Sequence, residues 1–333
     1  MFGDIPGEIL GEVPSDTTLH EIVTLACRAP SIHNSQPWIW RLQGPELRLY
    51  ADYDRAVPVA DPNNRQLIIS VGAALHHLQV AAAAQGLRTE VIRLPSPPRP
   101  DHLATVQFVG RQTPTPADLA RARAITERFT DRLPLGAAPE DRLSDLVDAV
   151  STRSGTHIVM LASDTHPTLA HASRISAFQR RYDATYHDEL AWWTAEDTDR
   201  REGIPPSSLT SPSEAQRVEV ARDFPLVITD HSRRSAVEVD HATVLVITGP
   251  GENTADHLAC GETLSDLLLE ATIGGLGTCI ISHVLEVESS RTMIDNLLSR
   301  SDPAQVLVRV GAGEGHRPAL TPRRPVDEVF SRN

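Results

Sequence analysis

A short segment at residues 28–38, RAPSIHNSQPW, concentrates groups that could bind a planar ligand. Pro30 restricts the backbone ahead of the hydroxyl of Ser31, and the side-chain amides of Asn34 and Gln36 both donate and accept hydrogen bonds. Such a set can read the edge of a heterocycle that alternates donors and acceptors. The residue types alone are equally compatible with a helix-capping loop that ends at a buried tryptophan.

A second candidate lies in the sequence RFTDR, where Arg128 and Arg132 flank Thr130. We expect a charged helical segment over residues 120–132, in which the i, i+4 spacing would place both guanidinium groups on one face. Arginines arranged in this way can hold a phosphate group. Because acidic residues adjoin both arginines, a surface helix with ordinary salt bridges is the alternative.

Two further segments carry weaker signals. In GGLGTC, residues 274–279, three glycines lack a Cβ, so a ligand could approach the backbone amides closely; the alternative is a simple helix C-cap. Near the end of the chain, Arg323 and Arg324 precede the sequence PVDEVF. These arginines could also reach a phosphate, and a solvated basic tail is the alternative.

An internal repeat indicates how these segments are positioned. Residues 72–89, GAALHHLQVAAAAQGLRT, align without gaps with residues 261–278, GETLSDLLLEATIGGLGT. The matched apolar positions step by three and four, which predicts two buried helices that each end at a glycine. A strand ending in glycine follows each helix, at residues 104–110 and 305–311. The chain is therefore expected to consist of two related halves.

We place these halves at residues 1–115 and 116–333, joined by the Pro- and Thr-rich stretch near residues 111–119. The second half contains a segment without a counterpart in the first, at about residues 165–240. Other elements expected in the second half are a helix over 139–153 and buried strands over 157–162 and 243–248.

The insertion at about 165–240 is expected to contain a polar, aromatic helix around residues 170–194 and a loop at Pro205-Pro206. Long insertions in compact domains are usually functional or mobile. We expect a lid in which aromatic residues, Trp192 and Trp193 among them, cover the ligand. The alternative is that the insertion packs elsewhere, over a sheet edge or a second, degenerate site.

Composition excludes several classes of function. All 31 lysine-plus-arginine residues are arginine, which excludes a pyridoxal phosphate Schiff base and a lysine-dependent P-loop. A formal charge of -13 argues against nucleic acid as a partner. No apolar run approaches the roughly 18 residues of a membrane span, and the acidic, Pro-containing N-terminus does not resemble a signal peptide, so we expect a cytoplasmic protein without a membrane partner. We expect no metal site, and three buried, structural cysteines: Cys27, Cys260 and Cys279.

Residues 29–38 match the pattern APSxxNxQPW at every fixed position, and this pattern resembles the flavin-edge segment of the nitroreductase superfamily. The resemblance implies bound FMN, with its phosphate held by the arginines of RFTDR and of the C-terminal segment, and with the glycine-rich segment beside the flavin. In that family the arginine segment usually opens the chain, whereas here it stands at the head of the second half.

The motifs divide unevenly, because the first half holds the edge segment and the second half holds the arginines and the glycines. Over essentially the whole chain this arrangement resembles the Acg-like branch of the superfamily. The resemblance implies an α+β, nitroreductase-like fold with antiparallel sheets flanked by helices, duplicated into a monomer that acts as an intramolecular pseudo-dimer with one FMN. The expected cofactor-binding residues are Arg28, Pro30, Ser31, Asn34, Gln36, Trp38, Arg128, Thr130, Arg132, Gly275, Leu276, Gly277, Arg323 and Arg324.

Two functions follow from this resemblance. One is an FMN-dependent NAD(P)H oxidoreductase that reduces nitro or quinone acceptors, in which the flavin carries the chemistry and no catalytic acid, base or nucleophile is expected. The other is a flavin-binding or flavin-sequestering protein whose insertion closes over the FMN. A Rossmann dehydrogenase is excluded, because no G-x-G-x-x-G follows an N-terminal strand.

Overall fold

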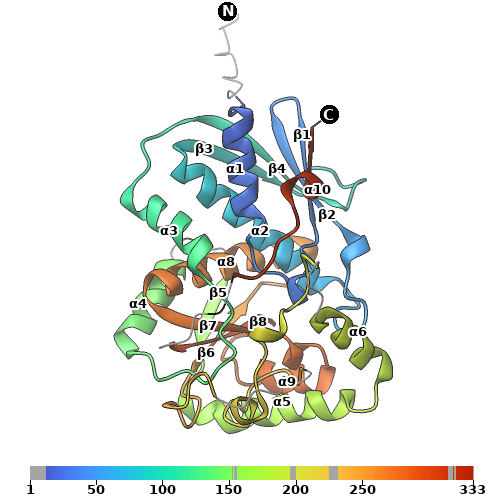
Figure 1. Cartoon of the computed structure of the whole chain (residues 1–333), viewed down its shortest axis with the longest axis vertical. Helices are drawn as coiled ribbons and strands as arrows, with labels where there is room; N and C mark the ends of the chain where they lie inside the picture. Colours follow the sequence, from blue (N-terminus) through green and yellow to red (C-terminus); the bar gives the residue numbers. More distant parts are fainter. Residues whose placement is uncertain are drawn as a thin grey trace, which may run out of the picture.

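The computed structural model describes residues 13–332, except 152, 154–155, 196–199, 225–231, 314–317 and 319. The first twelve residues, on which the expectation about a signal peptide rests, lie outside the described part. Two sheets lie at opposite ends of the molecule, with a pair of long helices between them (Figure 1). The fold is thus α+β, with sheets that are antiparallel at all but one strand pair, as predicted.

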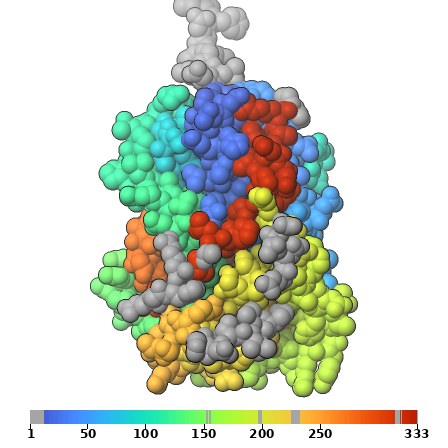
Figure 2. All heavy atoms as spheres, viewed as in Figure 1, coloured from blue at the N-terminus to red at the C-terminus, as the bar shows by residue number. Residues whose placement is uncertain are grey.

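The first sheet has the strand order β3-β4-β2-β1-β9 and the second the order β5-β6-β8-β7. The strands of the first sheet are β1 (Trp38–Gln43), β2 (Glu46–Ala51), β3 (Leu87–Arg93), β4 (His102–Arg111) and β9 (Phe330–Arg332). Those of the second are β5 (His157–Met160), β6 (Thr243–Thr248), β7 (Leu276–Ile281) and β8 (Ala304–Ala312). The C-terminal strand β9 joins β1 in parallel, so the end of the chain lies on the N-terminal sheet (Figures 1 and 2).

Helices surround and separate the sheets. The α-helices are α1 (Asp16–Ala26), α2 (Arg65–Ala84), α3 (Pro116–Glu127), α4 (Glu140–Ser151), α5 (His166–Arg180), α6 (Ala184–Thr194), α7 (Pro212–Ala215), α8 (Thr254–Ile273), α9 (Glu288–Asp295) and α10 (Val326–Val329). Short 3₁₀ turns are η1 (Ile32–Asn34), η2 (Tyr53–Arg55), η3 (Ser163–Thr165), η4 (Pro206–Ser208) and η5 (His283–Leu285). The α4 helix confirms the helix expected over 139–153, with Leu143, Leu146 and Val150 buried.

The repeat-matched helices α2 and α8 cross in the centre of the molecule at their matched glycines. A Cβ added to Gly72 would lie 2.2 Å from the carbonyl oxygen of Leu258, and one added to Gly261 would lie 2.0 Å from that of Ile69. The two backbones can approach this closely only because neither glycine has a side chain. The repeat therefore marks the contact that holds the two sheets together.

The elements around these helices follow the same order in both parts of the chain. A glycine in the left-handed conformation follows each helix, Gly86 at φ 72° and Gly275 at φ 71°, and a strand begins at the next residue. The sheet orders β3-β4-β2-β1 and β7-β8-β6-β5 correspond strand by strand. The turn between β1 and β2 is short, at Gly44, whereas the insertion separates β5 from β6.

The helix expected over 120–132 is wrong in its second part. The α3 helix ends at Glu127, and Arg128 has the extended angles φ -65° and ψ 144°. Thr130 instead forms a parallel bridge with Thr278 of β7, and the Asp131 N–H donates to the Thr278 carbonyl at 2.7 Å. In an extended chain alternate residues share a face, so Arg128, Thr130 and Arg132 still project to one side.

Two other expectations need correction. The single helix expected around 170–194 is two helices, α5 and α6, because the carboxylate of Asp183 caps the start of α6. The strand β5 ends at Met160 and is half exposed, since it forms the edge of its sheet, whereas β6 is buried as expected.

One helix, α2, is long and apolar enough to cross a membrane by length and composition alone, with a mean hydropathy of 1.6 in its most apolar window. The expectation that no apolar run approaches that length is therefore wrong. Of that window, 78% is buried inside the structure, so α2 fits the description of a core helix.

Candidate functional site

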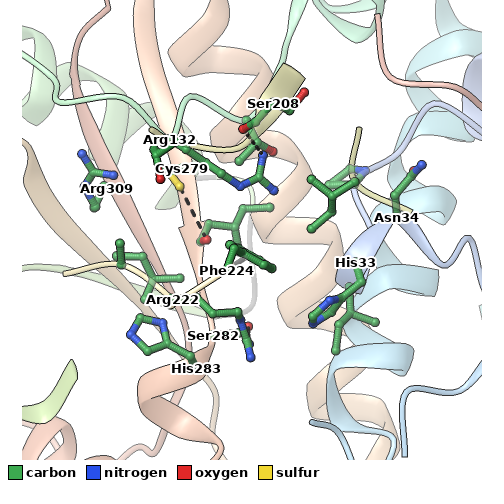
Figure 3. A pocket seen from close by; sticks show the side chains of 18 of the residues that line it. His33, Asn34, Arg132, Ser208, Arg222, Phe224, Cys279, Ser282, His283 and Arg309 are labelled. Atoms are coloured by element: carbon green, nitrogen blue, oxygen red, sulfur yellow. Dashed lines mark hydrogen bonds between the residues drawn. The ribbon is translucent and has the colours of Figure 1, made fainter. Parts of the chain in front are cut away.

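A cavity of about 700 Å³ opens between the two parts of the fold. Segments that lie far apart in the sequence line it, among them the turn and η1 at residues 28–34, one face of α2, residues 127–132 at and after the end of α3, the insertion between residues 203 and 224, and the end of β7. The C-terminal segment contributes Arg323. Figure 3 shows side chains from several of these segments facing one another across the cavity.

Three arginines meet at this cavity, and none of them has an acidic partner among the described residues. Arg28 lies in the turn after α1, Arg128 caps the end of α3, and Arg323 lies in the segment before α10. No carboxylate of the described residues forms an ion pair with any of the three. The buried Nε atoms of Arg28 and Arg128 have no hydrogen-bond partner there either.

The arginine cluster concentrates positive charge at the cavity. Burial, and next the charge of Arg28, lower the pKa of Arg128 to about 10. Burial, Arg128 and Arg28, in that order, hold the pKa of Arg323 well below its usual value. Arg323 is fixed by donating to the carbonyl oxygens of Cys27, Arg28 and Ala29 at 3.0, 3.1 and 3.3 Å. Three partly buried cations that repel one another would be stabilised by a bound phosphate.

Arg132 also lines the cavity but is separate from this cluster. It donates to the Ser208 carbonyl at 3.3 Å, and its guanidinium carbon lies 5.4 Å from the ring centroid of Phe224 (Figure 3). Burial lowers its pKa, although a guanidinium remains charged at neutral pH. Thr130 lines the cavity as well.

Only the first part of the predicted edge segment faces the cavity. Pro30, Ser31 and Asn34 line it, whereas Gln36 and Trp38 do not. Gln36 donates to the Arg201 carbonyl at 2.8 Å and accepts from the Arg324 N–H at 2.9 Å. Trp38 begins β1 and is fully buried in the core.

Asn34 joins the same set of contacts, because its amide donates to the carbonyls of Gly203 at 3.0 Å and Pro322 at 3.2 Å. The backbone here is unusual: His33, Asn34 and Gln36 have φ values of 47°, 58° and 53°. Such left-handed angles are costly for residues other than glycine and are often found at binding sites. In this chain the segment both lines the cavity and fastens the insertion and the C-terminal segment to it.

Four more predicted site residues lie outside the cavity lining. Arg324 faces Asp52, with Nη1 3.5 Å from Oδ2, and its Nε lies 3.6 Å from Glu328 Oε2. The other three are Gly275, Leu276 and Gly277. A Cβ on Gly277 would meet the Leu135 side chain at 2.9 Å, so its close approach is to the segment after α3. The part of β7 and its end that lines the cavity comes slightly later, at residues 279–282.

The insertion supplies lining residues that no sequence motif marks. Phe224 lies in the centre of the view in Figure 3, and Ile204 and Pro205 also line the cavity. The tryptophans expected to cover the ligand do not line it: Trp192 is 47% exposed, and Trp193 is buried beside Tyr186.

A buried ion pair anchors this part of the insertion. Arg222 pairs with Glu286 and donates to the Tyr186 hydroxyl at 2.6 Å and to Ser282 Oγ at 3.2 Å. Burial raises the pKa of Glu286, but Arg222 outweighs it and brings that pKa to about 2. Gln66 of α2 also donates to Glu286, at 3.0 Å. The wall that carries Phe224 is therefore fastened to both parts of the fold.

No family model matches the chain. Over 311 residues it is 42% identical to a Mycobacterium tuberculosis protein named "Putative NAD(P)H nitroreductase acg", covering 92% of this chain and 93% of that protein. A second protein of that organism, also named "Putative NAD(P)H nitroreductase", is 31% identical over 331 residues, which cover 98% and 95% of the two chains. Among solved structures, a nitroreductase with bound FMN from Desulfitobacterium hafniense matches 64% of this chain and 97% of its own, with a TM-score of 0.41 and 11% identity.

Proposed function

The chain belongs to the nitroreductase family, in its Acg-like branch, and on that basis we propose that it is an FMN-dependent oxidoreductase that uses NAD(P)H to reduce nitro or quinone acceptors. The observation that carries the proposal is the cluster of Arg28, Arg128 and Arg323 at the cavity, without an acidic partner among the described residues. A terminal phosphate, such as that of FMN, would pair with the Nε groups of Arg28 and Arg128, which have no partner among the described residues. Arg323, whose guanidinium nitrogens already donate to backbone carbonyls, would add positive charge beside it.

Other residues fit the rest of the cofactor. Arg132 would place a permanent positive charge beside the polar edge of the ring, where it stabilises negative charge. Pro30, Ser31 and Asn34 line the same cavity from the N-terminal part, and Phe224 excludes water from the insertion side. Bound FMN would supply hydride and electron transfer.

Two titratable groups that line the cavity, Cys279 and His33, are held in their neutral forms. Burial raises the pKa of the Cys279 thiol, and burial and Arg222 lower the pKa of His33 to about 3. Neither group suits proton transfer at neutral pH. We therefore propose that solvent, and not a dedicated acid, protonates the reduced product.

We also propose one FMN per chain, held by a duplicated fold that acts as a pseudo-dimer with halves 1–115 and 116–333. The matched strand orders and the crossing of α2 with α8 support the duplication. At the repeat-matched position of the first half, Arg88 replaces Gly277, and Arg93 is paired with Glu262 at 2.7 Å. Arg93 is thus neutralised, unlike the arginines of the cavity.

The purified protein, or the protein reconstituted with flavin, should therefore be yellow and should release FMN on denaturation, at about one per chain. Chromatography of the released flavin identifies it, and absorbance against protein concentration gives the stoichiometry. Released FAD would contradict the phosphate assignment, and about two FMN per chain would contradict the single site.

A second function is supported by the anchored insertion. Because Arg222, Tyr186 and Asn34 tie the insertion to the rest of the fold, it could cover the flavin and exclude nicotinamide. The protein would then bind or sequester FMN without turnover.

Stopped-flow mixing of the FMN-loaded protein with NADPH or NADH separates the two functions. We expect bleaching of the flavin absorbance by at least one of them if the protein is a reductase. Bleaching by dithionite, but by neither nicotinamide, would establish the sequestering function instead.

A further inference from the structure

His33 lies in the cavity wall, and its imidazole ring has no hydrogen-bond partner among the described residues. The side chain is 7% exposed, and its Nδ1 is buried without a hydrogen-bond partner. Neither ring nitrogen is paired within the part of the chain that the structure describes, and Figure 3 shows the ring facing the cavity. A buried polar group without a hydrogen-bond partner destabilises the fold, so its retention points to a ligand that pairs with it.

The surrounding residues fix the ring in this position. His33 adopts a left-handed backbone angle, φ 47°, beside the anchored Asn34. Its ring packs edge-on against Phe224, with centroids 6.0 Å apart, and lies 6.4 Å from the ring of Trp193. Burial, and next the charge of Arg222, lower its pKa to about 3, so the imidazole is neutral and offers one N–H donor and one acceptor.

The residues that line the cavity near His33 indicate which kind of ligand its N–H would contact. Ile32, Ile69, Ile204 and Ile281 line the cavity with apolar surface. Arg132 adds a cation that, within the described part of the chain, donates to the Ser208 carbonyl and lies near the ring of Phe224. An apolar wall with a neutral donor and a cation suits a flat, apolar molecule that carries an oxygen with accepting lone pairs.

We propose that the His33 imidazole N–H hydrogen-bonds an oxygen of the electron acceptor, and so selects planar aromatic acceptors that carry such an oxygen, as nitroarenes and quinones do. This inference rests on the proposed function, and it assigns to His33 the recognition of the acceptor and not of the flavin.

Benzoate is a suitable probe, because its planar group with two oxygens has the shape of a nitro group and is not reduced. Toluene offers the same ring without the oxygens. Binding of each to the FMN-loaded protein is measured by calorimetry without a reductant. We expect benzoate to bind more tightly than toluene to the wild type.

His33→Phe keeps an aromatic ring against Phe224 but removes both nitrogens. It should weaken benzoate binding roughly three- to tenfold, the effect of one lost hydrogen bond, and leave toluene binding unchanged. His33→Asn keeps an N–H donor and tolerates the left-handed backbone, so it should retain most of the affinity for benzoate. His20→Phe, which makes the same change at an exposed histidine of α1 outside the cavity lining, is the control and should bind benzoate as the wild type does.

The dissociation constant for FMN, measured by fluorescence quenching, should stay within about twofold of the wild type in every variant. Unchanged benzoate affinity in both His33 variants would overturn the inference. A loss of FMN affinity in His33→Phe, with benzoate unaffected, would assign His33 to the flavin instead. If the wild type binds no FMN, the proposed function fails, and the role of His33 is then decided by titrating the flavin-free proteins with benzoate. Weaker benzoate binding by His33→Phe than by the wild type supports the role of His33. Equal benzoate binding by the two proteins refutes it.

Discussion

Replacing Arg128 and Arg323 together by alanine is expected to lower the affinity for FMN by about a thousandfold. Each charge-assisted contact to a phosphate contributes roughly 1.5–3 kcal/mol, or about 10- to 100-fold in the dissociation constant. The two effects will not add exactly as independent ones, because both arginines would contact one group. A fluorescence-quenching titration with FMN measures the loss. Riboflavin, which lacks the phosphate, should bind wild type and double variant with similar affinity.

Arg324→Ala is the matched control, since Arg324 is adjacent in sequence but faces Asp52 and Glu328 outside the cavity lining. Its affinity for FMN should remain within about threefold of the wild type. The sequence alone favours Arg324 as the phosphate ligand, with Arg323 as the next candidate, and the structure reverses that order. If Arg324→Ala loses FMN while the double variant keeps it, the phosphate site lies elsewhere and the arginine cluster is structural.

The difference between these adjacent arginines illustrates what the sequence could not decide. An arginine pair before a short apolar helix is visible in the sequence, but the direction of each side chain depends on distant partners. Arg323 is held by the carbonyls of residues 27–29, and Arg324 by Asp52. The carbonyls of residues 27–29 and the carboxylate of Asp52 lie roughly 270–300 residues before these arginines in the sequence, so no local pattern indicates these contacts.

Elements whose conformation depends on nearby residues are predicted well from the sequence. The helices α2 and α8 and the strands after them carry their own periodicity and terminal glycines, so their position follows from local sequence. Residues 128–132 have helical composition, but pairing of Thr130 with Thr278 draws them into an extended conformation. Tertiary pairing overrides local preference there.

The insertion shows most clearly what the sequence alone does not predict. Its length marked it as a segment of interest, and it does line the cavity. The sequence favours the adjacent tryptophans as the residues that cover the ligand, yet Phe224 lines the cavity and Trp192 does not. Which aromatic residue faces the cavity depends on the ion pair between Arg222 and Glu286, and no spacing in the sequence indicates that pair.

The second large effect is expected from Gly261→Ala, which should destabilise the fold by about 3 kcal/mol or more. A Cβ at this position would lie 2.0 Å from the Ile69 carbonyl oxygen and 2.9 Å from the Ala73 nitrogen and the Gly72 Cα. All three are backbone atoms, so no change of rotamer can relieve the overlap, and α2 and α8 must move apart.

Moving these helices would also disturb the cavity, because Ile69 and Ser70 of α2 and Leu264 of α8 line it. Gly274→Ala is the matched control: it lies at the end of the same helix with a right-handed φ of -71°, and a Cβ there would meet its nearest atoms at 3.4 and 3.5 Å. Thermal melting of the flavin-free proteins should place Gly261→Ala roughly 6–12 °C below the wild type and Gly274→Ala within about 3 °C of it. A Gly261→Ala variant that melts with the wild type would mean that the two backbones do not meet at the matched glycines, and it would remove the strongest support for a duplicated fold built around that contact.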